Sequence, residues 1–302
     1  MPGERVLLLM KSYLGDAVIA TPLIRSLSAL QLTVRAPQVV HELLRSPEHL
    51  YQALPATNIH RPWRVWQEAR VLRKHRFDAA VLLNRSFRTA ILAKLAGIPV
   101  RIGHGTEGRK VLLTDPVPYS EIEPEALSYM HLAEPLGWFS DDLTPRLHVT
   151  EEERAAGKAA LEGAKVGFQP GARYPEKTVP PEIWRHVAKE LESRGIGYVV
   201  MGGQDETAEA ERYPRARNLI GQLGLRASMG AAAALRVLAG GDTGFMHIAA
   251  AVGCPTITVF GPTVVEKWAH FEAPHQIIRA RDGAIQNVTG EELWAAFELA
   301  LA

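Results

Sequence analysis

Cysteine is almost absent from this 302-residue sequence, in which Cys254 is the only one. A single cysteine excludes an internal disulfide and any metal site built from several thiolates, and it is typical of a reducing compartment. A charge excess is missing too, because 34 Lys and Arg residues stand against 33 Asp and Glu residues. A nearly neutral chain gives no global indication of nucleic-acid binding, so any basic function is expected to be local.

Long hydrophobic runs are also missing. The apolar residues 6–10 are too few for the core of a signal peptide, and residues 245–261 are interrupted by a histidine and a Gly-Cys-Pro turn. We therefore expect a cytoplasmic protein without a membrane span, in contact with a membrane at most from its surface.

Short β-rich runs alternate with helical patterns along most of the chain, which is typical of a parallel sheet built from crossover units. The expected strands are residues 6–10, 32–36, 78–84, 100–104, 165–170, 197–203, 216–221, 235–241 and 256–261. The expected helices include residues 17–30, 86–97, 181–195, 205–212 and 242–253.

Residues 138–165 interrupt this alternation with a polar, proline-containing stretch and one charged helix, which we interpret as a connection between domains. The chain is long enough for two hydrophobic cores. We predict an α/β protein with two Rossmann-like, doubly wound domains, residues 1–150 and 151–302, that face each other across a cleft. Ligands of such sheets bind beyond the carboxyl ends of the strands, where the functional residues are expected.

Three strand ends in the second half carry glycine with polar or cationic residues: Gly171, Arg173 and Lys177; Asp242, Thr243 and Gly244; Gly261, Pro262 and Thr263. Backbone N–H groups at a helix start and nearby cations both favour phosphate, so together these loops predict a phosphate site. Taken alone, Asp242 and Thr243 would simply cap a helix, and His247 would be a buried histidine bonded to a backbone carbonyl.

Gly15 and Asp16 stand between the first strand and the first helix. The simpler interpretation makes Asp16 the N-cap, a role worth about 1 kcal/mol. The alternative makes it a general base. A G-x-G-x-x-G motif does not follow this first strand, so a dinucleotide site is not predicted there.

Four segments, residues 15–27, 77–104, 169–180 and 242–263, resemble the ADP-heptose:lipopolysaccharide heptosyltransferases of glycosyltransferase family 9 in order and spacing. The most specific motif, D-[ST]-G-x-x-H-x-A-A followed by [FY]-G-P-T, is matched by residues 242–250 and 260–263. The similarity extends over nearly the whole chain. It implies a GT-B fold with an acceptor-binding first domain and a donor-binding second one. In that fold the final helix, about residues 289–302, often packs back on the first domain.

The resemblance implies an inverting glycosyltransferase that moves a sugar, expected to be heptose, from ADP-heptose to a lipopolysaccharide-core or related glycan. Asp16 would deprotonate the acceptor hydroxyl, and Glu206 would grip a ribose hydroxyl. The donor would be bound by Gly171, Lys177, Glu206, Asp242, Thr243, Gly244, His247 and Thr263. No cofactor or metal is expected beyond the nucleotide sugar itself, and no nucleic-acid partner.

The basic stretch 60–76 holds six Lys or Arg residues against one Glu. Most such helices are only solvated. An anionic lipid-linked acceptor, which the resemblance implies, would suit Arg61 and Arg64, and Trp63 and Trp66 would suit the cytoplasmic face of the inner membrane.

Two positions depart from the family pattern: Val179, where a tryptophan is frequent, and Val264, which follows Pro-Thr in place of Asp. Two other functions stay open at this point. One is a nucleotide-sugar epimerase or hydrolase on the same scaffold, which would act on the donor without an acceptor. The other is a non-catalytic nucleotide-sugar-binding protein, for which Asp16 would be dispensable.

Overall fold

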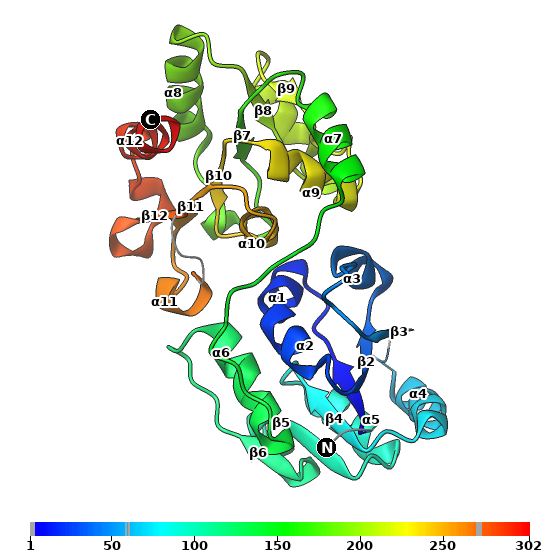
Figure 1. Ribbon diagram of the computed structural model, residues 1–302. Helices are drawn as coiled ribbons and strands as arrows, with labels where there is room; N and C mark the ends of the chain where they lie inside the picture. Colours follow the sequence, from blue (N-terminus) through cyan, green and yellow to red (C-terminus); the bar gives the residue numbers. More distant parts are fainter. Residues whose placement is uncertain (1–3, 58, 60, 270–273) are drawn as a thin grey trace. The chain divides into compact units, whose positions relative to one another are not determined.

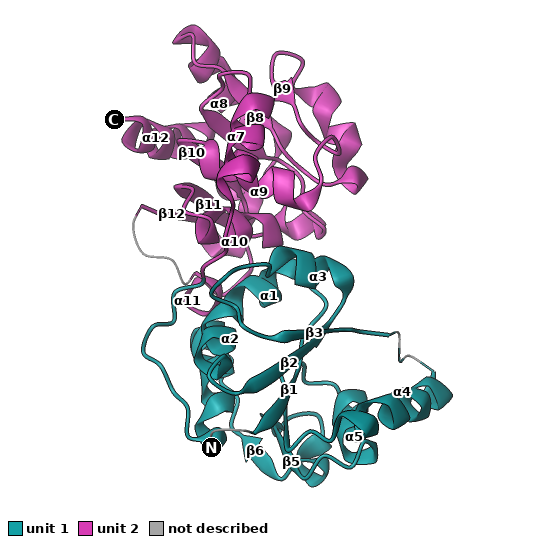
Figure 2. Ribbon diagram, turned by 45° about the vertical axis from the view of Figure 1, so that its right-hand side comes forward, with its two compact units in different colours: residues 1–145 teal, residues 146–302 magenta. Residues whose placement is uncertain are grey.

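The computed structural model describes residues 4–57, 59, 61–269 and 274–302. The chain forms two compact units, residues 1–145 and 146–302 (Figure 2). The sequence analysis placed this boundary after residue 150.

Unit 1 contains one parallel sheet in the order β3-β2-β1-β4-β5-β6 (Figure 1). Its strands are β1 (Arg5–Leu9), β2 (Gln31–Ala36), β3 (Gln52–Pro55), β4 (Ala79–Leu82), β5 (Val100–His104) and β6 (Asp115–Val117). Its helices are α1 (Leu14–Ile19), α2 (Thr21–Leu27), α3 (Gln38–Leu43), α4 (Pro62–His75), α5 (Phe87–Leu95) and α6 (Glu125–Met130).

Unit 2 repeats this plan with the order β12-β11-β10-β7-β8-β9, again parallel. Its strands are β7 (Val166–Gln169), β8 (Tyr198–Val200), β9 (Arg217–Asn218), β10 (Val237–Gly241), β11 (Thr256–Phe260) and β12 (Gln276–Arg279). Its helices are α7 (Glu151–Ala160), α8 (Pro181–Ser193), α9 (Leu225–Ala234), α10 (Gly244–Ala251), α11 (Val265–Trp268) and α12 (Gly290–Leu301).

The strands that the sequence analysis missed, β3, β6 and β12, all lie at sheet edges. An edge strand is buried on fewer sides than a central one, so it needs no continuous apolar run. Their sequences, QALP, DPV and QIIR, show this mixed character. The helix expected at residues 205–212 is a 3₁₀ helix, η4 (Gln204–Arg212).

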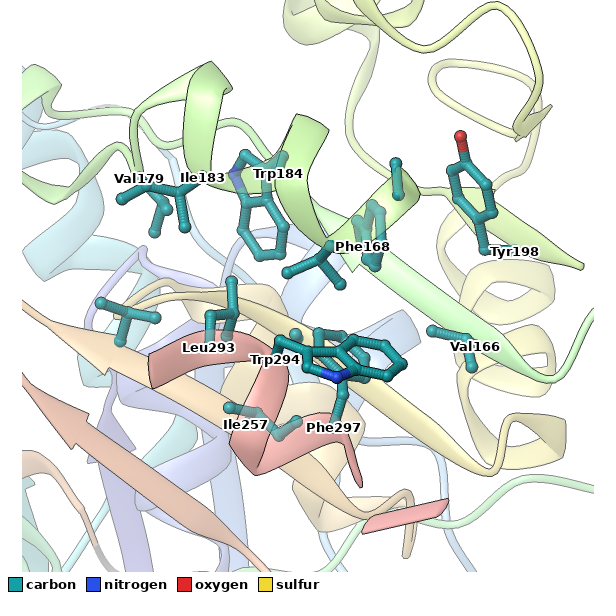
Figure 3. Packing of buried hydrophobic residues seen from close by; sticks show 14 of the residues in the cluster. Val166, Phe168, Val179, Ile183, Trp184, Tyr198, Ile257, Leu293, Trp294 and Phe297 are labelled. Carbon is teal, nitrogen blue, oxygen red and sulfur yellow. The ribbon is translucent and has the colours of Figure 1, made fainter. Parts of the chain in front are cut away.

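The core of unit 2 lies between its sheet and the helices α8 and α12 (Figure 3). Phe168 of β7 packs against Trp184 of α8 and Phe297 of α12, with ring centres 5.0 and 5.7 Å apart. The buried side chains of α12, Leu293, Trp294 and Phe297, all belong to this cluster. The apolar face of the final helix is therefore used within unit 2, and its packing on the first domain stays a prediction.

The charged helix α7 is part of unit 2 and not of a connection, which corrects the interpretation of residues 138–165. It packs against α9 with the two backbones in contact. A Cβ on Gly157 would lie 2.1 Å from the backbone N of Ala231, and one on Gly230 would lie 2.0 Å from the carbonyl oxygen of Glu153. Only glycine at both positions allows this approach.

A Gly157→Ala variant is expected to lower the free energy of unfolding by about 1–3 kcal/mol, because α7 and α9 must move apart. The gain of about 1 kcal/mol in helix propensity offsets only part of this cost. Gly197→Ala is the matched control, since its Cβ would meet its nearest atom at 3.7 Å. Chemical denaturation measures both, and equal stability of the two variants would contradict the close helix contact.

Among the described residues, no helix combines the length and apolar character that crossing a membrane requires.

Candidate functional site

Asp16 lies in the first turn of α1, just beyond the carboxyl end of β1. The simpler interpretation, in which Asp16 is the N-cap, does not hold, because the helix begins at Leu14 and Tyr13 is the N-cap. Its carboxylate is engaged by side chains instead of by the helix backbone.

Two donors bind one oxygen of this carboxylate. Lys11 Nζ and the Tyr129 hydroxyl each lie 2.7 Å from Asp16 Oδ1. Lys11 Nζ also contacts Glu125 Oε1 at 3.0 Å. Burial, followed by the charges of Asp16 and Glu125, raises the pKa of Tyr129 well above its usual value, so its hydroxyl stays a donor. The Asp16 side chain is 13% exposed and can still be reached from solvent.

The sequence analysis missed Lys11, Glu125 and Tyr129. Glu125 and Tyr129 lie one turn apart on α6, which places them on one face of that helix. Nothing local connects this face with Asp16, since Tyr129 is 113 residues further along the chain.

In unit 2, β7, β10 and β11 are neighbours, so the loops that follow them meet at one sheet edge. Lys177 Nζ lies 2.6 Å from Asp242 Oδ2, and His247 Nε2 lies 3.7 Å from Asp242 Oδ1. Burial alone would raise the pKa of Asp242, but His247 and Lys177 outweigh it and hold the pKa well below its usual range. The ionised Asp242 thus fixes the Lys177 ammonium at this edge.

Gln169, at the end of β7, ties several predicted residues together, although the sequence analysis did not select it. Its Nε2 donates to the Gly171 carbonyl at 2.5 Å and to Glu206 Oε1 at 3.2 Å. Its Oε1 accepts from the Thr243 hydroxyl at 2.8 Å. Gln169 is buried. Its position as the polar last residue of an otherwise apolar strand was the sequence signal that could have identified it as a site residue.

Glu206 of η4 lies against the loop after β7. A Cβ at Gly171 would lie 2.0 Å from Glu206 Oε1, so this carboxylate needs glycine there. Glu206 Oε2 accepts from the Gly203 N–H at 2.7 Å, and burial raises the pKa of the Glu206 carboxyl. The structure therefore joins Gly171, Glu206 and Thr243 through Gln169.

Thr243 is the N-cap of α10, which begins at Gly244, but its hydroxyl bonds Gln169 and not the helix backbone. Thr263 is half-buried in the segment between β11 and α11. Its side chain forms no hydrogen bond with another described residue. Val179 is buried in the unit 2 core (Figure 3).

Arg61 and Arg64 are exposed at the start of α4, while His60 lies outside the described residues. The Arg61 guanidinium lies 5.0 Å from the centre of the Trp63 ring. Glu68, the one acidic residue of α4, points inward and bonds Arg35 of β2 at 2.7 Å. The exposed side of α4 therefore carries cations and tryptophans without a carboxylate.

Residues 65–293 match the family model described as glycosyltransferase family 9 (heptosyltransferase). The chain belongs to glycosyltransferase family 9. It is therefore a glycosyltransferase, and the epimerase and non-catalytic interpretations are set aside. Lipopolysaccharide heptosyltransferase 2 of Escherichia coli K12 is 29% identical over 295 residues, which cover 86% of this chain and 83% of that protein. Lipooligosaccharide heptosyltransferase 2 of Haemophilus ducreyi is 26% identical, covering 94% and 91%.

Solved structures of family 9 share the fold. The E. coli ADP-heptose lps heptosyltransferase II superimposes with a TM-score of 0.82 at 25% identity, covering 98% of both chains. A family 9 glycosyl transferase from Veillonella parvula gives a TM-score of 0.84 at 18% identity, covering 99% of this chain and 97% of that one. The predicted fold class, GT-B with two Rossmann-like parallel sheets, is confirmed.

Proposed function

We propose that this family 9 enzyme transfers a heptose from ADP-heptose to a lipopolysaccharide-core saccharide, with inversion at the anomeric carbon and Asp16 as the general base. The names of its relatives support the substrates. The observation that carries the chemistry is the Asp16 carboxylate, held by Lys11 and Tyr129 yet still accessible at the carboxyl edge of the unit 1 sheet.

In this reaction Asp16 takes the proton of an acceptor hydroxyl while that oxygen forms a bond to the anomeric carbon. The bond between the anomeric carbon and the diphosphate oxygen breaks, and its electron pair leaves with ADP. A single displacement of this kind inverts the configuration. Negative charge grows on the leaving diphosphate, and Lys177, fixed by Asp242, supplies the opposing charge.

The remaining donor residues follow from the same arrangement in unit 2. Glu206 would accept hydrogen bonds from the ribose hydroxyls, while Gly171 and Gly244 would leave backbone N–H groups open to the phosphates. Thr243, His247 and Thr263 would line the diphosphate and the sugar. Because the Lys177 ammonium would compensate the negative charge of the leaving diphosphate, we infer that transfer does not depend on a divalent ion.

The direct test incubates the purified protein with ADP-heptose and a heptose-deficient lipopolysaccharide, with and without EDTA. The expected products are ADP and an acceptor heavier by one heptose, with inverted anomeric configuration by NMR, in both conditions. Donor conversion in the absence of acceptor would contradict the transfer function. Loss of activity in EDTA would contradict only the metal-independent mechanism.

We also propose that the exposed side of α4 contacts an anionic membrane surface. Trp63 and Trp66 are 53% and 56% exposed, and the surrounding cations suit acidic headgroups.

A Trp63→Ala/Trp66→Ala variant is expected to lose most of its sedimentation with phosphatidylglycerol vesicles, while phosphatidylcholine vesicles bind neither protein. Leu299→Ala, which removes an exposed apolar side chain from α12, is the matched control and should sediment as the wild type does. Equal sedimentation of all three proteins would contradict a role for α4.

A further inference from the structure

Both hydrogen bonds of the Asp16 carboxylate fall on the same oxygen. Oδ1 accepts from Lys11 Nζ and from the Tyr129 hydroxyl, each at 2.7 Å. Within the part of the chain that the structure describes, no hydrogen bond or ion pair reaches Oδ2. A carboxylate whose one oxygen is bound by two donors cannot rotate freely, so the direction of Oδ2 is fixed as well.

Lys11 is shared between two carboxylates. Its Nζ lies 2.7 Å from Asp16 Oδ1 and 3.0 Å from Oε1 of Glu125, whose side chain is only 2% exposed. The Tyr119 hydroxyl donates to the other oxygen of Glu125 at 3.1 Å. When Asp16 accepts a proton, Lys11 and Glu125 remain as a neutral pair, so no buried ammonium is left without a counterion.

We propose that Lys11 and Tyr129 are positioning residues that hold Asp16 Oδ1, so that Oδ2 takes the proton of the acceptor hydroxyl, and that Glu125 keeps Lys11 in place throughout. This inference rests on the proposed function, in which Asp16 is the base.

Other charged and titratable groups lie around Glu125. The Arg85 guanidinium lies 4.1 Å from the centre of the Tyr119 ring. Burial raises the pKa of Tyr119 above its usual range and lowers that of His104 to about 4, with Glu125 acting on both. Because His104 titrates on the acid side, pH profiles are also measured in a His104→Gln background.

The test measures kcat/KM against pH for Lys11→Met and Glu125→Gln. Lys11→Met removes the cation and leaves two like charges together, so the acid limb should move to higher pH by about one unit. In Glu125→Gln the Lys11 ammonium pairs with Asp16 only, so the acid limb should move to lower pH by about one unit. Both should reduce kcat about tenfold or more, with unchanged ADP affinity.

Three further variants complete the design. Tyr129→Phe should reduce kcat and move the acid limb to higher pH, and Lys11→Arg, which retains the charge, should restore most of the wild-type profile. Lys94→Met, which removes an exposed lysine of α5, is the matched control and should leave the profile unchanged.

The outcomes separate this proposal from the proposed function. Transfer retained by Asp16→Asn overturns the assignment of the base and the positioning role with it. An inactive Asp16→Asn with unmoved acid limbs in Lys11→Met and Glu125→Gln overturns the positioning role alone. The positioning role is also overturned if the acid limbs of Lys11→Met and Glu125→Gln move in the same direction. It is likewise overturned if the loss of kcat in these variants follows a lower melting temperature.

Discussion

An Asp16→Asn variant is expected to transfer sugar about 10²–10⁴ times more slowly than the wild type, the range that general base catalysis supplies. Asparagine has the same shape, and its carbonyl oxygen can keep the hydrogen bonds of Lys11 and Tyr129. Its amide nitrogen replaces the oxygen that would take the proton, so only the chemical step is lost. ADP affinity, measured by calorimetry, should stay at the wild-type value because the residues proposed to bind the donor lie in unit 2.

Asp141→Asn is the matched control for this variant, since it makes the same change at an exposed position of unit 1. It should transfer at the wild-type rate. Normal turnover by Asp16→Asn, or a rate loss explained by weaker ADP binding, would remove Asp16 from the role of the base.

A Lys177→Met variant is expected to differ from Asp16→Asn in ADP affinity, which should fall about 10–100-fold, as expected for a lost charge-assisted hydrogen bond. Two effects add in this case. The diphosphate loses its ammonium partner, and Asp242, only 5% exposed, loses the closer of its two partners and keeps only His247. The carboxylate then repels the anionic ligand. Calorimetry against ADP measures the change, and kcat should fall as well because the leaving group is less stabilised.

A double variant separates the two effects of Lys177. In Lys177→Met/Asp242→Asn the repelling carboxylate is gone, so ADP affinity should recover part of the loss seen in Lys177→Met. Lys189→Met on α8 is the matched control, because this lysine is exposed in the same unit, and it should bind ADP normally. Unchanged affinity in Lys177→Met would place this ammonium outside the phosphate site.

The central strands could be predicted because burial on both faces demands apolar runs, as in VLLL of β1 and VGFQ of β7. The helix α7 could be predicted as well, since Thr150 and Glu153 form a capping box at its start. Its close contact with α9 could not, because it depends on Gly230 of α9 meeting Gly157.

The loops of the candidate site were predictable for a similar reason. Glycine with polar residues directly after a buried strand places Lys177, Asp242 and Thr243 at a common sheet edge, and this edge follows from the α/β pattern alone. The ion pair between Lys177 and Asp242 was not predicted. It forms because β7 and β10 are neighbours in the sheet, and the strand order cannot be derived from the residues at the strand ends.

By itself the sequence determined the α/β class, the central strands, the glycine-bearing strand ends and, through its motifs, the family. The tertiary structure alone decided which side chains meet: Glu125 and Tyr129 at Asp16, Gln169 at Glu206, and α12 on the core of unit 2. Periodicity and turn chemistry act over a few residues, whereas these contacts join segments brought together by the order of strands in a sheet and the packing of helices on it. No local pattern records that order.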